Sequence, residues 1–91
     1  MTRSIDQATG TQLLDRAVAI MKFLGEAGER GARMAEIGEE LALKPSTAHR
    51  IVSALERHGL IEREQATKRY RLGLALFALG ATAADGTGLR K

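Results

Sequence analysis

The chain has 91 residues, of which 44% are hydrophobic and 27% charged; these values fit one compact domain and exclude a disordered chain. It contains no cysteine, which excludes disulfides and cysteine-based zinc sites. No apolar run approaches the roughly 20 residues that span a bilayer, and residues 1–10 lack the apolar stretch of a signal peptide. We therefore expect a soluble, cytoplasmic protein with no membrane partner.

The net charge of +3 is unevenly distributed along the chain. Residues 1–43 have a balance of −2, whereas residues 44–71 carry seven basic side chains against three acidic ones. A polyanion would meet its positive surface in the second segment. Charge alone does not separate this interpretation from an ordinary solvated face.

The first half of the sequence predicts a loose arm and two helices. Residues 1–10 are expected to form the flexible arm, and apolar residues at helical spacing predict a helix from Leu13 to Leu24. Glycines then mark a loop through Arg33. A second helix is predicted from Met34 to Ala42.

The second half begins with a third helix from Pro45 to His58, because proline is tolerated in a first turn and Gly59 is a natural stop. Leu60–Arg63 and Lys68–Leu72 read as two short strands of a hairpin joined by a polar turn. A last helix begins over Leu74–Leu79, whose apolar residues surround the axis and therefore require cover on more than one side. The tail from Ala81 onward is expected to be frayed.

This order predicts a mainly α fold with a small β-hairpin, a winged helix-turn-helix with a three-helix core, a wing and a C-terminal linker helix. We expect the arm over residues 1–10, the winged helix-turn-helix over 11–73, and the linker helix with its frayed tail over 74–91.

The third helix is predicted to have two faces. At about 100° per residue, one arc holds apolar side chains and the opposite arc polar and cationic ones. The apolar arc contains Ala48, Ile51, Val52 and Leu55, and the polar arc Ser46, His49, Arg50, Ser53 and Arg57. Such groups suit a DNA major groove, where arginine donates two parallel hydrogen bonds to guanine. The alternative is an ordinary amphipathic surface helix.

The segment before this helix favours DNA recognition over that alternative. Ile37, Leu41, Ala48 and Ile51 occupy the buried positions of a helix-turn-helix, with Gly38 at a close approach and Leu43 plugging the turn. Two departures are visible. Ala42 stands where a left-handed backbone would cost roughly 1 kcal/mol, and Arg33 is a poor helix cap.

The hairpin carries four basic residues, namely Arg63, Lys68, Arg69 and Arg71. Cations on a wing favour the phosphate backbone or the minor groove, and Lys68 and Arg69 near the tip are the stronger candidates. Glu62 and Glu64 offer the alternative of plain surface ion pairs.

With these residues in place, the sequence resembles the N-terminal domain of IclR-family transcriptional regulators over about Leu13 to Gly80. The resemblance lies in Leu14-Asp15-Arg16-Ala17, Ala35-Glu36-Ile37-Gly38, Ser46-Thr47-Ala48-His49-Arg50, Tyr70-Arg71-Leu72-Gly73 and Leu79-Gly80. It implies a homodimer, weak or DNA-dependent in this short form, that binds double-stranded DNA at the bacterial nucleoid, as a repressor more than an activator. It also implies that a C-terminal effector-binding domain, which would take a small-molecule effector, is absent from these residues.

Together these observations predict sequence-specific DNA binding by an operator-reading domain, with the helix over 45–58 in the major groove and the wing over 60–72 on the backbone or in the minor groove. The expected DNA-binding residues are Lys44, Pro45, Ser46, Thr47, His49, Arg50, Ser53, Arg57, Lys68 and Arg69. The sequence shows no triad, phosphate loop or metal-ligand cluster, so we expect no enzyme, metal or cofactor. The rival interpretation is a winged helix that binds a protein or RNA.

Overall fold

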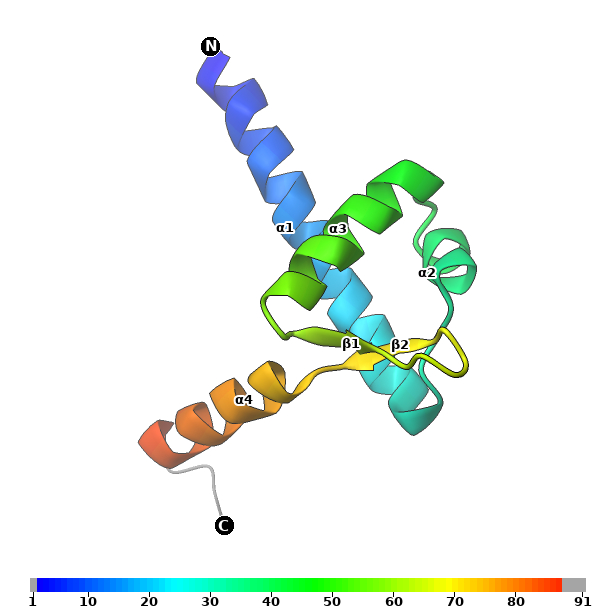
Figure 1. Ribbon diagram of the computed structural model, residues 1–91. Coiled ribbons are helices and arrows are strands. Elements are labelled where there is room, and N and C mark those ends of the chain that lie inside the picture. Colours follow the sequence, from blue (N-terminus) through cyan, green and yellow to red (C-terminus); the bar gives the residue numbers. More distant parts are fainter. Residues whose placement is uncertain (1, 88–91) are drawn as a thin grey trace.

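The computed structural model describes the backbone of residues 2–87 and the side chains of residues 10–86. Four α-helices, a short 3-10 helix and a two-stranded hairpin follow one another in the expected order (Figure 1). The elements are α1 (Thr2–Ala27), η1 (Gly28–Arg30), α2 (Met34–Glu40), α3 (Pro45–Arg57), β1 (Ile61–Arg63), β2 (Tyr70–Leu72) and α4 (Leu74–Thr87). This is the predicted winged helix-turn-helix.

The first helix is much longer than expected. It begins at Thr2 instead of near Leu13, so the expectation of a loose arm over residues 1–10 is not met where the backbone is described. The segment contains no proline, and Gly10 inside a helix costs only about 1 kcal/mol. A helix already formed from Leu13 onward extends backward across one glycine, because propagation is easier than nucleation.

A tight turn joins α2 to α3. The backbone N–H of Leu43 donates to the carbonyl oxygen of Gly38 at 2.8 Å, and a Cβ on Gly38 would lie 3.3 Å from the Leu43 carbonyl oxygen. Gly38 therefore lies in close contact with the backbone of the turn that follows α2. Ala42 has a φ of +54°, which confirms the left-handed backbone expected there without a glycine.

The start of α2 uses a different cap from the usual one. Arg33 contributes no side-chain cap, but its backbone N–H donates to Glu36 Oε1 at 2.7 Å. Glu36 thereby satisfies one of the unpaired N–H groups at the helix end. The deficit expected from Arg33 is partly offset by a carboxylate three residues later.

The hairpin strands are shorter than predicted, three residues each. Ile61 lies opposite Leu72 and Arg63 opposite Tyr70. Ala32 extends this small sheet, since its N–H donates to the Tyr70 carbonyl at 2.9 Å and its carbonyl accepts from the Tyr70 N–H at 2.7 Å. The wing is thus tied to the loop before α2.

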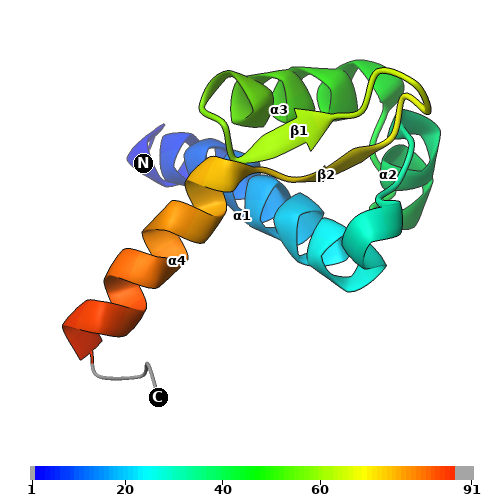
Figure 2. The same cartoon turned by 60° about the horizontal axis from the view of Figure 1, so that its bottom comes forward.

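The core lies where α1, α2, α3 and the hairpin meet (Figure 2). Its fully buried large side chains are Ile20, Leu24, Ile37, Val52 and Ile61. Each such side chain stabilises the fold by roughly 1.5–3 kcal/mol through the removal of apolar surface from water. This core fixes α3 against α1 and leaves the other side of α3 outward.

The last helix projects from the body of the domain (Figures 1 and 2). Leu74, Phe77 and Leu79 are 74%, 63% and 61% exposed. The helix continues to Thr87, so the prediction of a frayed tail is wrong for residues 81–87. Residues 88–91 lie outside the described part of the chain. At its start, the Leu74 N–H donates to Glu62 Oε2 at 3.2 Å. Among the described residues, no helix is long and apolar enough to cross a membrane.

Candidate nucleic-acid interface

The recognition-helix candidate, α3, has the two faces that its sequence predicts. Ala48, Ile51, Val52 and Leu55 are 0–7% exposed. The opposite side, here called the outward face, consists of Ser46, Thr47, His49, Arg50, Ser53 and Arg57. Thr47 and Ser53 are half-buried and the other four are exposed. The local amphipathic pattern therefore places all six on the solvent side.

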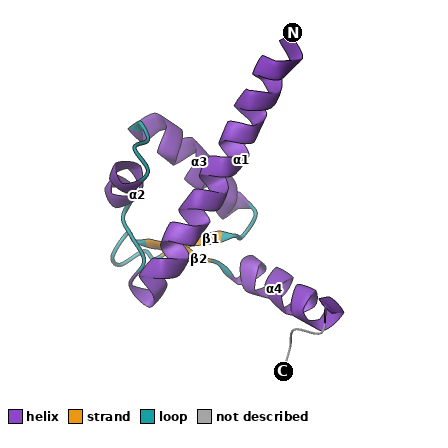
Figure 3. Ribbon diagram, turned by 180° about the vertical axis from the view of Figure 1, so that it is seen from behind, coloured by secondary structure: helices purple, strands orange, loops and turns teal. Residues whose placement is uncertain are grey.

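The outward face lies on the side of α3 away from α1, except at one edge, where Arg50 and Arg57 border α1. In Figure 1 α3 passes in front of α1, and in Figure 3, seen from behind, α1 is in front. No described element passes in front of α3 in Figure 1, where α2 lies to its right and the hairpin below it. A duplex groove therefore has access to this surface.

The N-terminus of α3 adds favourable electrostatics for an anion. Lys44 precedes the helix as its N-cap, Pro45 occupies the first turn, and the first turn carries no acidic side chain. The backbone N–H groups of this turn and the helix dipole both favour a phosphate. Lys44 and Pro45 are exposed, as their expected role requires.

Two halves of the outward face have different surroundings. Arg50 and Arg57 line a shallow groove between α3 and α1. Ser53 Oγ and His49 Nδ1 lie 3.5 Å apart, one helical turn from each other. The face therefore offers long guanidinium groups along one edge and short hydroxyl and imidazole groups beside them.

The wing differs from α3, because two of its arginines, Arg69 and Arg71, form ion pairs. Arg69 Nη1 lies 3.5 Å from Glu36 Oε1, and the Arg69 side chain is only 20% exposed. Arg71 Nη1 lies 3.4 Å from Glu64 Oε1. Lys68, in contrast, is exposed and enters neither pair. Of the two tip residues expected to bind DNA, Lys68 is the free cation, and Arg69 connects the wing to α2.

Glu36 has a structural role that the sequence pattern did not predict. It caps α2 and also holds Arg69. The hydrogen bond from the Arg33 backbone lowers the pKa of the Glu36 carboxyl; partial desolvation opposes this effect, and the nearby Arg69 guanidinium adds to it. A glutamate three residues after a helix N-cap is a recognisable capping signal, but its partner on the wing is 33 residues away.

Comparisons with known proteins place the chain among transcriptional regulators. A sequence model of the IclR helix-turn-helix domain matches residues 13–65. The chain is 39% identical over 78 residues to the glycerol operon regulatory protein of Streptomyces coelicolor, covering 86% of this chain and 30% of that protein. It is 38% identical over 73 residues to the HTH-type transcriptional regulator TtgV of Pseudomonas putida, covering 80% of this chain and 28% of that protein.

The fold is similar to solved structures as well. An IclR transcriptional regulator from Alicyclobacillus acidocaldarius has a TM-score of 0.76 at 32% identity, over 81% of this chain and 30% of that one. The chain thus spans about 30% of the length of the relatives it matches. These relatives are named as an operon regulatory protein and as transcriptional regulators. The chain belongs to the IclR family of DNA-binding transcriptional regulators and carries the helix-turn-helix domain of that family.

Proposed function

We propose that this domain reads an operator sequence in double-stranded DNA, with α3 in the major groove. The observation that carries the proposal is the outward face of α3, which is polar, cationic and open to solvent while its opposite side is buried. Recognition helices contact bases mainly through their N-terminal residues, which here are residues 45–50. Arg50 is the base-reading candidate, because a guanidinium matches the two acceptors of guanine.

The remaining expected contacts serve to position the domain. Lys44 and the first turn of α3 lie where a phosphate is favoured, and Lys68 extends from the wing toward the backbone or the minor groove. Arg57 lies two turns further along α3, within reach of the flanking backbone. Phosphate contacts fix the register of the protein on DNA but do not read its sequence.

We further propose that two copies of the chain pair through α1 when they bind DNA. Leu13, Leu14 and Val18 are 42%, 64% and 37% exposed, an apolar surface that a second α1 would cover. The apolar spacing of this helix would also allow Met21 and Phe23 to share in this surface, but both are partly buried against the core. A small remaining surface fits a dimer that is weak and depends on DNA.

The proposal also covers whether the chain represses or activates transcription, and whether a small molecule controls its binding to DNA. We propose repression at an operator in the bacterial nucleoid, measured as a lower reporter signal when the chain is expressed. We also propose that residues 1–91 do not respond by themselves to a small-molecule effector. A ligand that shifts their melting temperature by several degrees would contradict the second statement.

Selection from a random duplex library tests the proposed function. We expect enrichment of one inverted-repeat sequence, and footprinting of it should show protected half-sites about one helical turn, or about 34 Å, apart. Enrichment of no sequence, together with tighter binding to duplex RNA or to protein, would favour the rival use of the fold.

A further inference from the structure

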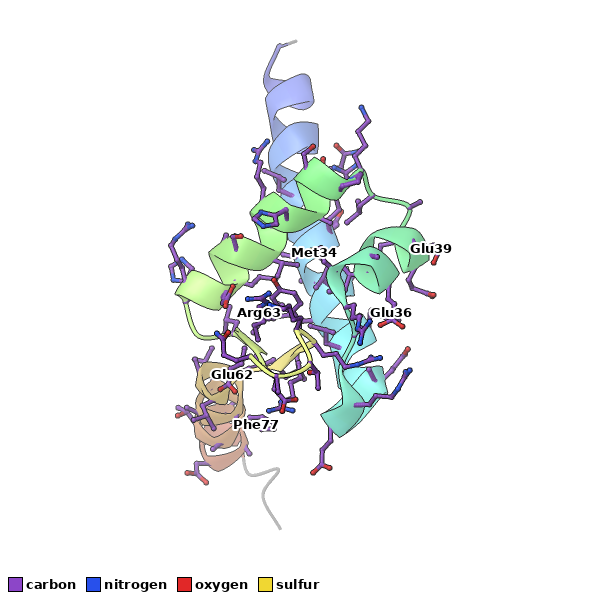
Figure 4. The ribbon with its side chains drawn as sticks, turned by 45° about the vertical axis from the view of Figure 1, so that its right-hand side comes forward. Met34, Glu36, Glu39, Glu62, Arg63 and Phe77 are labelled. Atoms are coloured by element: carbon purple, nitrogen blue, oxygen red, sulfur yellow. The ribbon has the colours of Figure 1, made fainter. Side chains whose placement is uncertain are left out.

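One arginine outside the predicted DNA-binding set lies between the two DNA-binding elements. Arg63 ends β1, opposite Tyr70. Residues directly opposite in an antiparallel pair point to the same side of the sheet, as do residues two apart. Arg63 therefore shares the inner side of the hairpin with Ile61 and Tyr70, which are buried. Figure 4 shows the Arg63 side chain between the hairpin and α3.

This guanidinium has no acidic partner among the described residues. The wing ion pairs use Arg69 and Arg71, and no side-chain hydrogen bond within the described part of the chain involves Arg63. Glu36 and Glu64, the acidic residues nearest to the wing in these contacts, are already engaged. Arg63 is nevertheless half-buried, so it has lost part of its hydration without gaining a counterion.

We propose that Arg63 binds a backbone phosphate of the DNA duplex where the strand passes between α3 and the wing. This inference rests on the proposed function. A guanidinium is planar, stays charged and matches two phosphate oxygens with parallel N–H groups. A partly desolvated cation interacts more strongly with an anion than a fully hydrated one does. Because β1 fixes its backbone, Arg63 is held in position before DNA arrives, unlike Lys68 on the loop.

The competing explanation is structural. The apolar stem of an arginine covers hydrophobic surface, and Arg63 lies beside the core residues Ile61 and Tyr70. In that case its removal would lower the melting temperature and leave the salt dependence of DNA binding unchanged. The experiment therefore needs both measurements.

Arg63→Gln and Arg63→Lys are compared with Lys22→Gln, which removes one exposed positive charge from α1, the helix behind α3 in the view of Figure 1. Fluorescence anisotropy measures their affinity for the selected duplex and for a scrambled duplex across a range of salt concentrations. We expect Arg63→Gln to weaken binding to both duplexes by about tenfold. The slope of log affinity against log salt should decrease in size by about 0.9. Arg63→Lys should recover most of the affinity and the slope.

Each other outcome has a definite meaning. Arg63→Gln with the affinity and slope of Lys22→Gln would overturn the inference, as would a lower melting temperature without a change in slope. A loss confined to the selected duplex would overturn the assignment to phosphate. In those cases the unaltered chain still binds the duplex and the proposed function stands; failure of the unaltered chain to bind any duplex would overturn both.

Discussion

The recognition helix and the wing are both rich in cations, but the structure treats their charges differently. On α3, Arg50 and Arg57 are exposed and enter neither of the wing's ion pairs. On the hairpin, Arg69 and Arg71 are held by Glu36 and Glu64. A count of basic residues makes the two regions look equivalent.

The difference shows that positive charge is available for DNA only where no acidic residue competes for it. The α3 arginines follow from local geometry, since their exposure depends on the helical period alone. Whether the wing arginines are available depends on contacts between residues that are far apart in the sequence and that the fold brings together. We therefore expect α3 to supply most of the affinity and specificity, and the wing to contribute through Lys68 and Arg63.

The largest expected effect comes from Arg50→Ala. Loss of one bidentate base contact should reduce affinity for the selected duplex by about tenfold to a hundredfold, with little effect on a scrambled duplex. Anisotropy measures both, and circular dichroism checks that the fold is intact. Lys22→Ala is the control. Unchanged binding by Arg50→Ala would remove α3 from its proposed role.

The wing residues give the next effect and sharpen the comparison. Lys68→Gln should weaken binding by about fivefold on any duplex and reduce the salt slope by about 0.9. Arg69→Gln should have a smaller effect on the slope, because Glu36 already neutralises Arg69. If the Arg69 variant changes the slope more than the Lys68 variant does, the ion pair opens on DNA and the contrast between helix and wing fails.

The turn at Ala42, which joins α2 to the recognition helix α3, has a left-handed backbone. Ala42→Gly should raise the free energy of unfolding by about 0.5–1 kcal/mol, since relief of strain exceeds the entropy that glycine adds to the unfolded chain. Chemical denaturation measures this change. Ala35→Gly, at an exposed position inside α2, should lower stability by about 1 kcal/mol. Two variants that shift stability in the same direction would show that Ala42 is not strained.

The smallest effect concerns Glu36 and depends on pH. Its pKa is lowered in the folded state, mainly by the Arg33 backbone N–H. The stabilisation is therefore fully present above the pKa of the unfolded chain, and is lost as pH falls through the lower folded value. Glu36→Gln should thus be less stable than the unaltered chain at neutral pH, and the difference should shrink as the pH falls below the ordinary pKa of a glutamate carboxyl. A difference that is independent of pH would exclude an ionic role for Glu36.

The sequence was sufficient for features that depend on neighbouring residues. Helical spacing predicted which side of α3 is buried, and the missing glycine at Ala42 predicted the strained turn. The sequence was insufficient where a weak helix-ending signal competed with the cooperative extension of a helix that had already formed. Gly10 did not end α1, and the small residues after Ala81 did not end α4.

Long-range contacts were the other limit. The Arg69–Glu36 pair and the burial of Met21 and Phe23 depend on how separate elements dock, which periodicity does not encode. The same is true of Glu62, which was considered as a partner for wing cations and instead accepts a hydrogen bond from the first N–H of α4. The exposed side of α3 could therefore be predicted from the sequence, whereas the pairing of the wing arginines could not.

Titration of the ¹⁵N-labelled chain with its selected duplex tests the central role of α3 most directly. We predict the largest amide shift changes over residues 44–50 and at Lys68, with small changes at Lys22 and along α4. Changes concentrated on α4 or on the exposed apolar side of α1, with residues 44–50 unaffected, would contradict DNA reading by α3.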